Sequence, residues 1–251
     1  MKTLTFLALV LALAPGAALA DDRQDFLSGK ANACQGCDFS DLDLSRRSYA
    51  GADLKGANLS GVNFYTTDLT GANLEGANLT RTDFTQANLS KANLAGTNTF
   101  ETIFYRATLN NADLTGSKGQ RVIFRRALMG GTRLDEAVMP FSQFEDSRLA
   151  GASARKADLK GSTFSGVKMQ RVDFTGGSVE GGDFTDAVLS KGHFAGAVLR
   201  RADLLRADLS DTDLKGADLS GTRLQAAILK GADTEGARFD GALMPDGNWH
   251  D

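Results

Sequence analysis

The stretch Ala72-Asn73-Leu74-Glu75-Gly76-Ala77-Asn78-Leu79-Thr80 states one five-residue phrase twice. The phrase has a small residue, Asn or Asp, a large apolar residue, a variable residue and often Gly. We name four positions by their first example here: small (Ala72), outward (Asn73), central (Leu74) and corner (Gly76). Stepping by five from Phe39 reaches Met244 without a slip, which gives 42 pentapeptides. A fixed period of this kind decides the architecture before any local motif does.

The repeat sorts residues by size and polarity. At the central position, 38 of the 42 residues are Leu, Phe, Met, Val or Tyr, and the exceptions are Thr99, Gly119, Ala154 and Thr234. At the small position, 40 of the 42 are Ala, Ser, Thr, Val, Gly or Cys, and the exceptions are Leu42 and Arg47. Helices repeat apolar residues every three or four positions and strands every two, so a period of five fits neither.

A period of five fits a chain that turns a corner after each short extended piece. Within a piece, the small and central residues share one face, as residues two apart do in a strand, and the residue between them points outward. The frequent Gly at the corner position suits a turn with positive φ. Four pieces close a square, so the sequence predicts coils of 20 residues.

The phrase resembles that of the pentapeptide-repeat family. It is clearest in Ala52-Asp53-Leu54-Lys55-Gly56, Ala112-Asp113-Leu114-Thr115-Gly116 and Ala217-Asp218-Leu219-Ser220-Gly221. The resemblance covers residues 37–244 and implies an all-β fold, a right-handed quadrilateral β-helix (solenoid) of about ten coils. It also implies that the central and small residues fill the interior of the rod.

Folding the register at 20 residues predicts columns of like side chains. One column holds Phe64, Phe84, Phe104, Phe124, Phe144, Phe164 and Phe184 in seven consecutive coils. The spacing of hydrogen-bonded strands, about 4.8 Å, suits offset stacking of such rings. We therefore expect a ladder of aromatic rings inside the rod.

The two ends of the chain depart from the repeat. Residues 1–20 have the pattern of a secretory signal peptide, with Lys2, an apolar run from Leu4 to Leu13, and Ala18-Leu19-Ala20 as the cleavage site. This predicts a periplasmic or secreted protein cleaved after Ala20. Residues 21–36 are expected to form a cap, in which Phe26 and Leu27 cover the first coil. Residues 245–251 form a tail in which Trp249 is expected to fold back over the last coil.

Cys34 and Cys37 are the only cysteines. A structural disulfide is favoured because a signal peptide directs the chain to an oxidising compartment. Two alternatives remain, a redox CxxC motif and a metal site, although the first lacks its usual βαβ context and the second lacks further ligands. The lead-in from Cys34 to Phe39 also resembles that of secreted pentapeptide-repeat proteins.

The middle of the repeat, residues 97–156, changes character. Thr99 and Gly119 replace large central residues in one column, and aromatic and basic side chains appear at positions that face outward. One interpretation is a degenerate stretch with a bulge or short loop. The other is a partner-binding patch, because Tyr and Arg are enriched in binding hot spots. Its candidate residues are Tyr65, Phe100, Tyr105, Arg121, Arg125, Arg126 and Phe141.

The sequence offers little for catalysis. Its two histidines, His193 and His250, build no Ser-His-Asp or Cys-His arrangement, and its many Asp residues recur with the repeat rather than as an isolated pair. Its glycines lie at corners and not in a phosphate-binding loop. We therefore expect no enzyme activity, no catalytic or metal-binding residues and no cofactor.

We expect a non-catalytic structural or protein-interaction scaffold. Its partner would be a protein or an envelope component, with no nucleic acid and no membrane insertion, and two copies could pair through a rod end. The alternative is a DNA-mimicking inhibitor or protector of a type II topoisomerase, because some members of the resembling family protect gyrase in this way. A duplex mimic needs a long field of negative charge, whereas this chain interleaves 28 Lys and Arg with 31 Asp and Glu.

Overall fold

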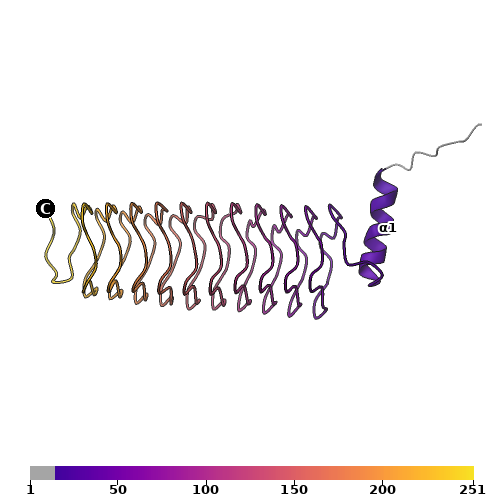
Figure 1. Cartoon of the computed structure of the whole chain (residues 1–251), viewed down its shortest axis with the longest axis horizontal. Helices are drawn as coiled ribbons and strands as arrows, with labels where there is room; N and C mark the ends of the chain where they lie inside the picture. Colours follow the sequence, from indigo (N-terminus) through magenta and orange to yellow (C-terminus); the bar gives the residue numbers. More distant parts are fainter. Residues whose placement is uncertain (1–14) are drawn as a thin grey trace, which may run out of the picture.

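The computed structural model describes residues 15–251, with side chains described from Asp21 onward. One helix, α1 (Pro15–Leu27), lies across the N-terminal end of a long rod, and the coils then stack in chain order to the C-terminus (Figure 1). Pro15 suits the first turn of a helix because its missing N–H needs no partner there. Gly29, with φ of 76°, follows the end of the helix. The apolar run from Leu4 to Leu13, expected to belong to a signal peptide, lies outside the described residues.

The rod is a β-helix in which the outward residue of each pentapeptide bridges to the outward residue 20 positions further on. Parallel bridges link Asp53 to Asn73, Asn73 to Asn93 and Asn93 to Asp113, and the same step holds in four columns up to Leu243. Every bridge involves the outward residue of a pentapeptide, so the described part of the chain contains isolated bridges rather than longer strands. Each extended piece is short because a turn follows it at once.

The corners confirm the role of the fifth position. Every fifth residue from Asp41 to Gly241 has positive φ, and 22 of these residues are not glycine. In the turn from Tyr49 to Ala52, the amide of Ala52 donates to the carbonyl of Tyr49 at 3.0 Å. Positive φ at the third residue of such a turn is the hallmark of type II geometry.

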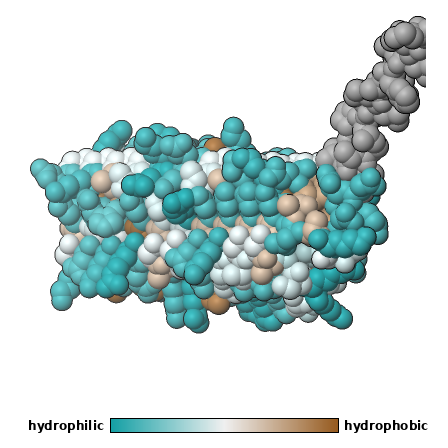
Figure 2. Space-filling view, turned by 45° about the vertical axis from the view of Figure 1, so that its right-hand side comes forward, coloured by the Kyte–Doolittle hydropathy of each residue, from teal (hydrophilic) through white to brown (hydrophobic). Residues whose placement is uncertain are grey.

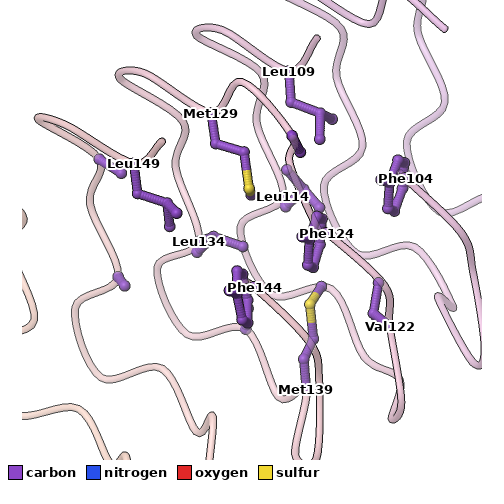
Figure 3. Close-up of a cluster of buried hydrophobic side chains, with 14 of the residues drawn as sticks. Phe104, Leu109, Leu114, Val122, Phe124, Met129, Leu134, Met139, Phe144 and Leu149 are labelled. Atoms are coloured by element: carbon purple, nitrogen blue, oxygen red, sulfur yellow. The ribbon is translucent and has the colours of Figure 1, made fainter. Parts of the chain in front are cut away.

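The interior is filled by the central and small side chains. Every central residue from Phe39 to Leu224 except Gly119 is buried, and Leu74, Phe124 and Leu209 have no exposed surface. The predicted ladder of phenylalanines runs from Phe64 to Phe184, with neighbouring ring centroids 4.6–5.1 Å apart. Figure 3 shows this ladder beside a second column of Leu109, Met129 and Leu149.

The two ends of the rod differ. At the N-terminal end, Phe26 is 3% exposed, and its ring lies 5.2 Å from that of Phe39 and 5.1 Å from that of Tyr49. At the other end, the tail pairs with the last coil in an antiparallel bridge between Leu243 and Trp249. Trp249 is 70% exposed, so the expectation that it covers the last coil is wrong. The bridge holds the tail along the edge of that coil, where its indole faces solvent.

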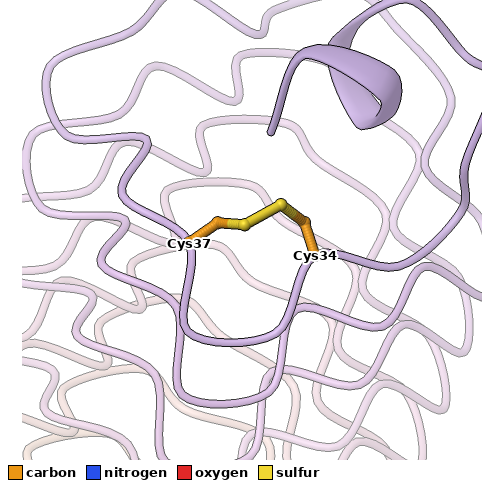
Figure 4. The surroundings of a disulfide bond; sticks show 2 residues. All are labelled: Cys34 and Cys37. Atoms are coloured by element: carbon orange, nitrogen blue, oxygen red, sulfur yellow. A yellow bond between two sulfur atoms is a disulfide. The ribbon is translucent and has the colours of Figure 1, made fainter. Parts of the chain in front are cut away.

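Cys34 and Cys37 form a disulfide with their Cα atoms 5.5 Å apart (Figure 4). The bond spans the turn that contains Gly36, and the amide of Cys34 donates to the carbonyl of Asp53 in the next coil at 2.8 Å. It therefore closes the first corner of the β-helix, directly after the cap.

Candidate functional site

The regular surface of the rod is interrupted where the central position holds Gly119. A Cβ added to Gly119 would lie 2.5 Å from both the carbonyl carbon and Oγ1 of Thr99. A side chain at this position would clash with the preceding coil, and Gly119 itself is partly exposed, whereas the central residues Thr99 and Met139 of the neighbouring coils are buried. The bridges from Asn98 to Lys118 and from Lys118 to Val138 continue through this region. The bulge or short loop considered from the sequence is absent from this described stretch, and the coil is indented instead.

The indentation forms an open groove of about 450 Å³. Its lining residues come from three consecutive coils: Asn98, Phe100, Lys118, Gly119, Gln120, Val138 and Pro140. Phe100, Val138 and Pro140 give it apolar walls, and Val138 is 41% exposed. The groove combines apolar walls with few polar groups, as binding clefts commonly do.

Two serines hold the backbone beside the groove. In a regular turn, the amide of Ala107 donates to the carbonyl of Phe104 at 3.0 Å. The corresponding amide of Val122 donates instead to Oγ of Ser142 at 3.1 Å, and that of Ser142 donates to Oγ of Ser162 at 3.0 Å. All three side chains are buried. The hydroxyls thus satisfy amides that would be costly to leave without a partner in the interior.

The corner next to the groove stacks Glu101, Arg121 and Phe141, all with φ between 54° and 59°. Phe141 is 55% exposed, and its ring covers the backbone of Gly161, where an added Cβ would lie 2.7 Å from two ring carbons. Arg121 pairs with Glu101 at 3.6 Å, and the same carboxylate pairs with Arg81 at 3.1 Å. A bulky aromatic residue in the left-handed region is uncommon and strained.

The following corner carries the remaining predicted residues. Arg106 lies over the ring of Tyr105, with its guanidinium carbon 5.3 Å from the ring centroid. Arg125 pairs with Glu145 at 3.8 Å, and Arg126 pairs with Asp146 at 3.5 Å. The outward positions between the two corners hold Ile103 and Ile123, which are half-buried, whereas the three preceding coils have Asp43, Asn63 and Asp83 there.

The structure thus separates the seven predicted residues into three places. Phe100, Arg121 and Phe141 adjoin the groove, and Tyr105, Arg125 and Arg126 occupy the next corner. Tyr65 is two coils away and lies under Arg46, 5.8 Å from the guanidinium carbon to the ring centroid. Four residues beside the groove could not be recognised from the repeat phrase alone: Val138, Pro140, Ile103 and Ile123. For Ile103, Ile123 and Val138, the signal in the sequence is the loss of Asn or Asp at outward positions.

Carboxylates around this region are held ionised by their neighbours. Burial raises the pKa of Asp135, but hydrogen bonds from Ser153, the Arg155 amide and the Arg155 guanidinium outweigh it and lower the pKa. The same balance lowers the pKa of Asp113, where Arg133 and Thr115 are the donors. Neither carboxyl group is placed to exchange protons near neutral pH. Between residues 15 and 251, no group of three or more His, Cys, Asp or Glu side chains is arranged to hold a metal ion.

No helix within the described residues is both long and apolar enough to cross a membrane.

Comparisons with known proteins identify the family. The family described as pentapeptide repeats (8 copies) matches residues 37–76, 67–98, 142–180, 183–221 and 217–244. These ranges cover more than half of the chain, and the gap from 99 to 141 contains every lining residue of the groove except Asn98. The chain belongs to the pentapeptide-repeat family.

Several solved structures are similar to this chain. HetL, a pentapeptide-repeat protein involved in heterocyst differentiation regulation in the cyanobacterium Nostoc sp. strain PCC 7120, is 29% identical with a TM-score of 0.50, covering 91% of this chain and 98% of HetL. Full-length QnrB1, a plasmid-mediated fluoroquinolone resistance protein, is 15% identical with a TM-score of 0.31, covering 83% and 93% of the two chains. A protein of the Arabidopsis thaliana thylakoid lumen is 23% identical with a TM-score of 0.27, covering 51% and 72%. The search of curated proteins found no match.

Proposed function

We propose that this protein is a non-catalytic scaffold of the bacterial periplasm or exterior that binds another protein at the groove and the two corners beside it. The scaffold would be a right-handed quadrilateral rod of about ten coils. Such a rod changes shape little on binding, so a partner meets a surface that is already ordered.

The observation that supports this proposal most is the indented coil at Gly119. The indentation leaves apolar walls and the exposed Phe141 next to each other on the surface of the rod. Figure 2 shows how hydrophilic side chains dominate one side of the rod, with apolar residues scattered among them. Aromatic and arginine side chains around an apolar cleft are typical of interface hot spots. The regulatory role of the similar HetL is also compatible with a binding function.

The test is the triple variant Tyr105→Ala, Arg125→Ala and Phe141→Ala. Partners are first identified by proximity labelling of the wild-type protein in the native host, and their binding is then measured with purified proteins. We expect the triple variant to weaken binding at least tenfold, since single hot-spot residues contribute about 2 kcal/mol or more. The control is Arg201→Ala with Trp249→Ala, which removes an exposed arginine and an exposed aromatic residue elsewhere on the rod. Unchanged binding of the triple variant to every partner would refute the proposal.

The proposed location rests on the signal-peptide pattern and on the cysteines. Cleavage after Ala20 would leave Asp21 to Leu27 of α1, and therefore Phe26, in the mature protein. Cell fractionation with N-terminal sequencing measures this directly. In addition, we expect Cys34 and Cys37 of the mature protein to resist alkylation until a reductant is added. An uncleaved protein in the cytoplasm, or immediate alkylation of both thiols, would count against the location.

The pattern of ion pairs argues against topoisomerase protection by duplex mimicry. Cations pair with carboxylates one coil away along the rod, as in Arg81–Glu101 at 3.1 Å, Arg155–Asp135 at 3.3 Å and Arg206–Asp186 at 2.6 Å. Alternating charges of this kind break up a continuous negative field. A gyrase supercoiling assay with quinolone present distinguishes the two functions, and we expect no protection.

A further inference from the structure

A different side of the rod carries four cations that have no carboxylate partner. Arg148 and Lys168 occupy neighbouring outward positions joined by a parallel bridge. Arg171 and Lys191 occupy neighbouring corner positions, with φ of 58° and 60°. All four side chains are exposed, and among the described residues none of them forms an ion pair. We name these four residues the cationic cluster.

The cluster is unusual for this chain. Nearby arginines do form ion pairs: Arg126 pairs with Asp146 at 3.5 Å, and Arg206 pairs with Asp186 at 2.6 Å. The acids that border the cluster at the preceding corner are therefore already engaged. Bridged outward residues lie about 5 Å apart, and like charges placed opposite each other at this distance are destabilising. An anionic partner would relieve this repulsion.

Apolar side chains share the column of Arg148 and Lys168. Bridges connect its outward residues in the order Leu128, Arg148, Lys168, Val188, Asp208 and Ile228. Leu128 is 39% exposed and Ile228 is 51% exposed, and Val188 is half-buried. Asp208 is the one carboxylate among these six residues, Asp68 lies further along the same column, and Asp211 follows Lys191 at the corner. Cations and hydrocarbon thus lie on one straight side of a rigid rod.

We propose that this side of the rod binds peripherally to a bilayer that contains anionic lipids. Basic side chains attract anionic headgroups, and neighbouring apolar side chains enter the boundary between headgroups and acyl chains. A nucleic acid or an acidic glycan would use the cations but would offer no hydrocarbon to Leu128 and Ile228. The proposal goes beyond protein binding at the groove, which is lined by other columns of the rod, so both surfaces can be occupied together.

The test measures flotation of the mature full-length protein with vesicles of phosphatidylcholine alone or with phosphatidylglycerol added. The cluster variant is Arg171→Glu with Lys191→Glu. The matched control is Lys156→Glu with Arg201→Glu, because these cations also occupy left-handed corner positions, are exposed and lack an ion pair among the described residues, but lie on other corners. Both variants change the net charge equally, and circular dichroism establishes that both remain folded.

We expect the wild-type protein to bind the anionic vesicles and not the neutral ones, with binding that weakens as salt is raised. The cluster variant should bind at least about tenfold more weakly, since each basic residue near an anionic surface is worth roughly 1 kcal/mol. The control should keep its affinity, and Leu128→Asn should weaken the binding that remains at high salt. Absent wild-type binding, or an equal loss in the control, would overturn the proposal. So would binding to single-stranded DNA or heparin but not to the anionic vesicles.

Discussion

Two neighbouring parts of the rod share one fold and differ in their surfaces. In coils 57–98, outward asparagines form ladders, as where Nδ2 of Asn78 donates to Oδ1 of Asn58 at 3.1 Å. In coils 99–141, the outward positions hold Ile103, Ile123 and Val138. The bridging step of 20 residues is the same in both. The solenoid therefore separates its interior from its surface, so the surface can change while the register persists.

The corners show the cost of that change. Glycine occupies four of the eight corner positions between residues 57 and 98, but only two of the nine between residues 99 and 141, where Glu101, Arg121 and Phe141 stack in one column. Each non-glycine residue in the left-handed region costs roughly 1 kcal/mol relative to glycine. Strain of this kind concentrates at functional sites when the surrounding structure enforces it. In this rod the enforcement comes from ladders of hydrogen bonds on both sides of every corner.

The largest expected effect tests whether the interior is packed equally well in the regular coils and beside the groove. Phe84→Ala removes a ring from the regular coils, and Phe124→Ala removes its counterpart in the same ladder beside the groove. The centroid of each ring lies within 5.1 Å of the centroids of the two neighbouring rings in the ladder. Each substitution should lower the free energy of unfolding by about 3–5 kcal/mol in urea titrations. A much smaller loss for Phe124→Ala would break the comparison, because it would show that the ladder is loosely packed near the groove.

The sequence predicted the interior of this protein well because a period of five leaves no other residues to fill it. The central position identified the buried ladder from Phe64 to Phe184, and the corner position identified positive φ. It could not predict how the rod responds to Gly119, since a missing side chain can leave a void or let the backbone move inward. The exposure of Trp249 could not be predicted for a related reason. Burial of the tail depends on hydrogen bonds at the last coil, which no repeat pattern describes.

The next effect concerns the indentation itself. Most central positions hold a large residue, so the repeat pattern alone would favour a side chain at Gly119. We expect a substitution here to destabilise the fold, because an added Cβ would lie 2.5 Å from the backbone of Thr99. Gly119→Ala should cost about 1–3 kcal/mol through overpacking. The control is Gly130→Ala, where the nearest atom is Oδ1 of Asn110 at 3.2 Å and φ is not in the left-handed region.

Chemical denaturation of these two variants distinguishes an indented coil from an empty one. If Gly119→Ala lost no more stability than the control Gly130→Ala, the coil would contain a void. The groove would then be a packing defect and not a shaped surface.

A smaller effect is expected at the corner beside the groove. Phe141→Gly removes left-handed strain, so we expect the free energy of unfolding to rise by up to about 1 kcal/mol. Contact between the Phe141 ring and Gly161 offsets part of this gain. The same variant should bind the partner protein more weakly. Arg171→Gly is the matched control at another left-handed corner, and it should be similarly stabilised without loss of partner binding. Loss of stability in Phe141→Gly would identify the aromatic ring as a structural element.

The smallest expected effect is a difference in acid sensitivity between the two regions. Ladders of neutral asparagine do not titrate, whereas Asp113 and Asp135 have pKa values below the ordinary value of about 4. A carboxyl group with a lowered folded-state pKa contributes stability above its unfolded pKa and loses it as pH falls through the folded value. This contribution is therefore complete at pH 5 and declines below about pH 4. Hydrogen exchange should show amides near Asp113 and Asp135 losing protection before those near Asn78 as pH is lowered, after correction for the intrinsic exchange rate. Asp135→Asn should narrow this difference, because it removes one titrating group while keeping a side chain of the same shape. Simultaneous loss along the whole rod would mean that the ion pairs add nothing local to the hydrogen bonds between coils.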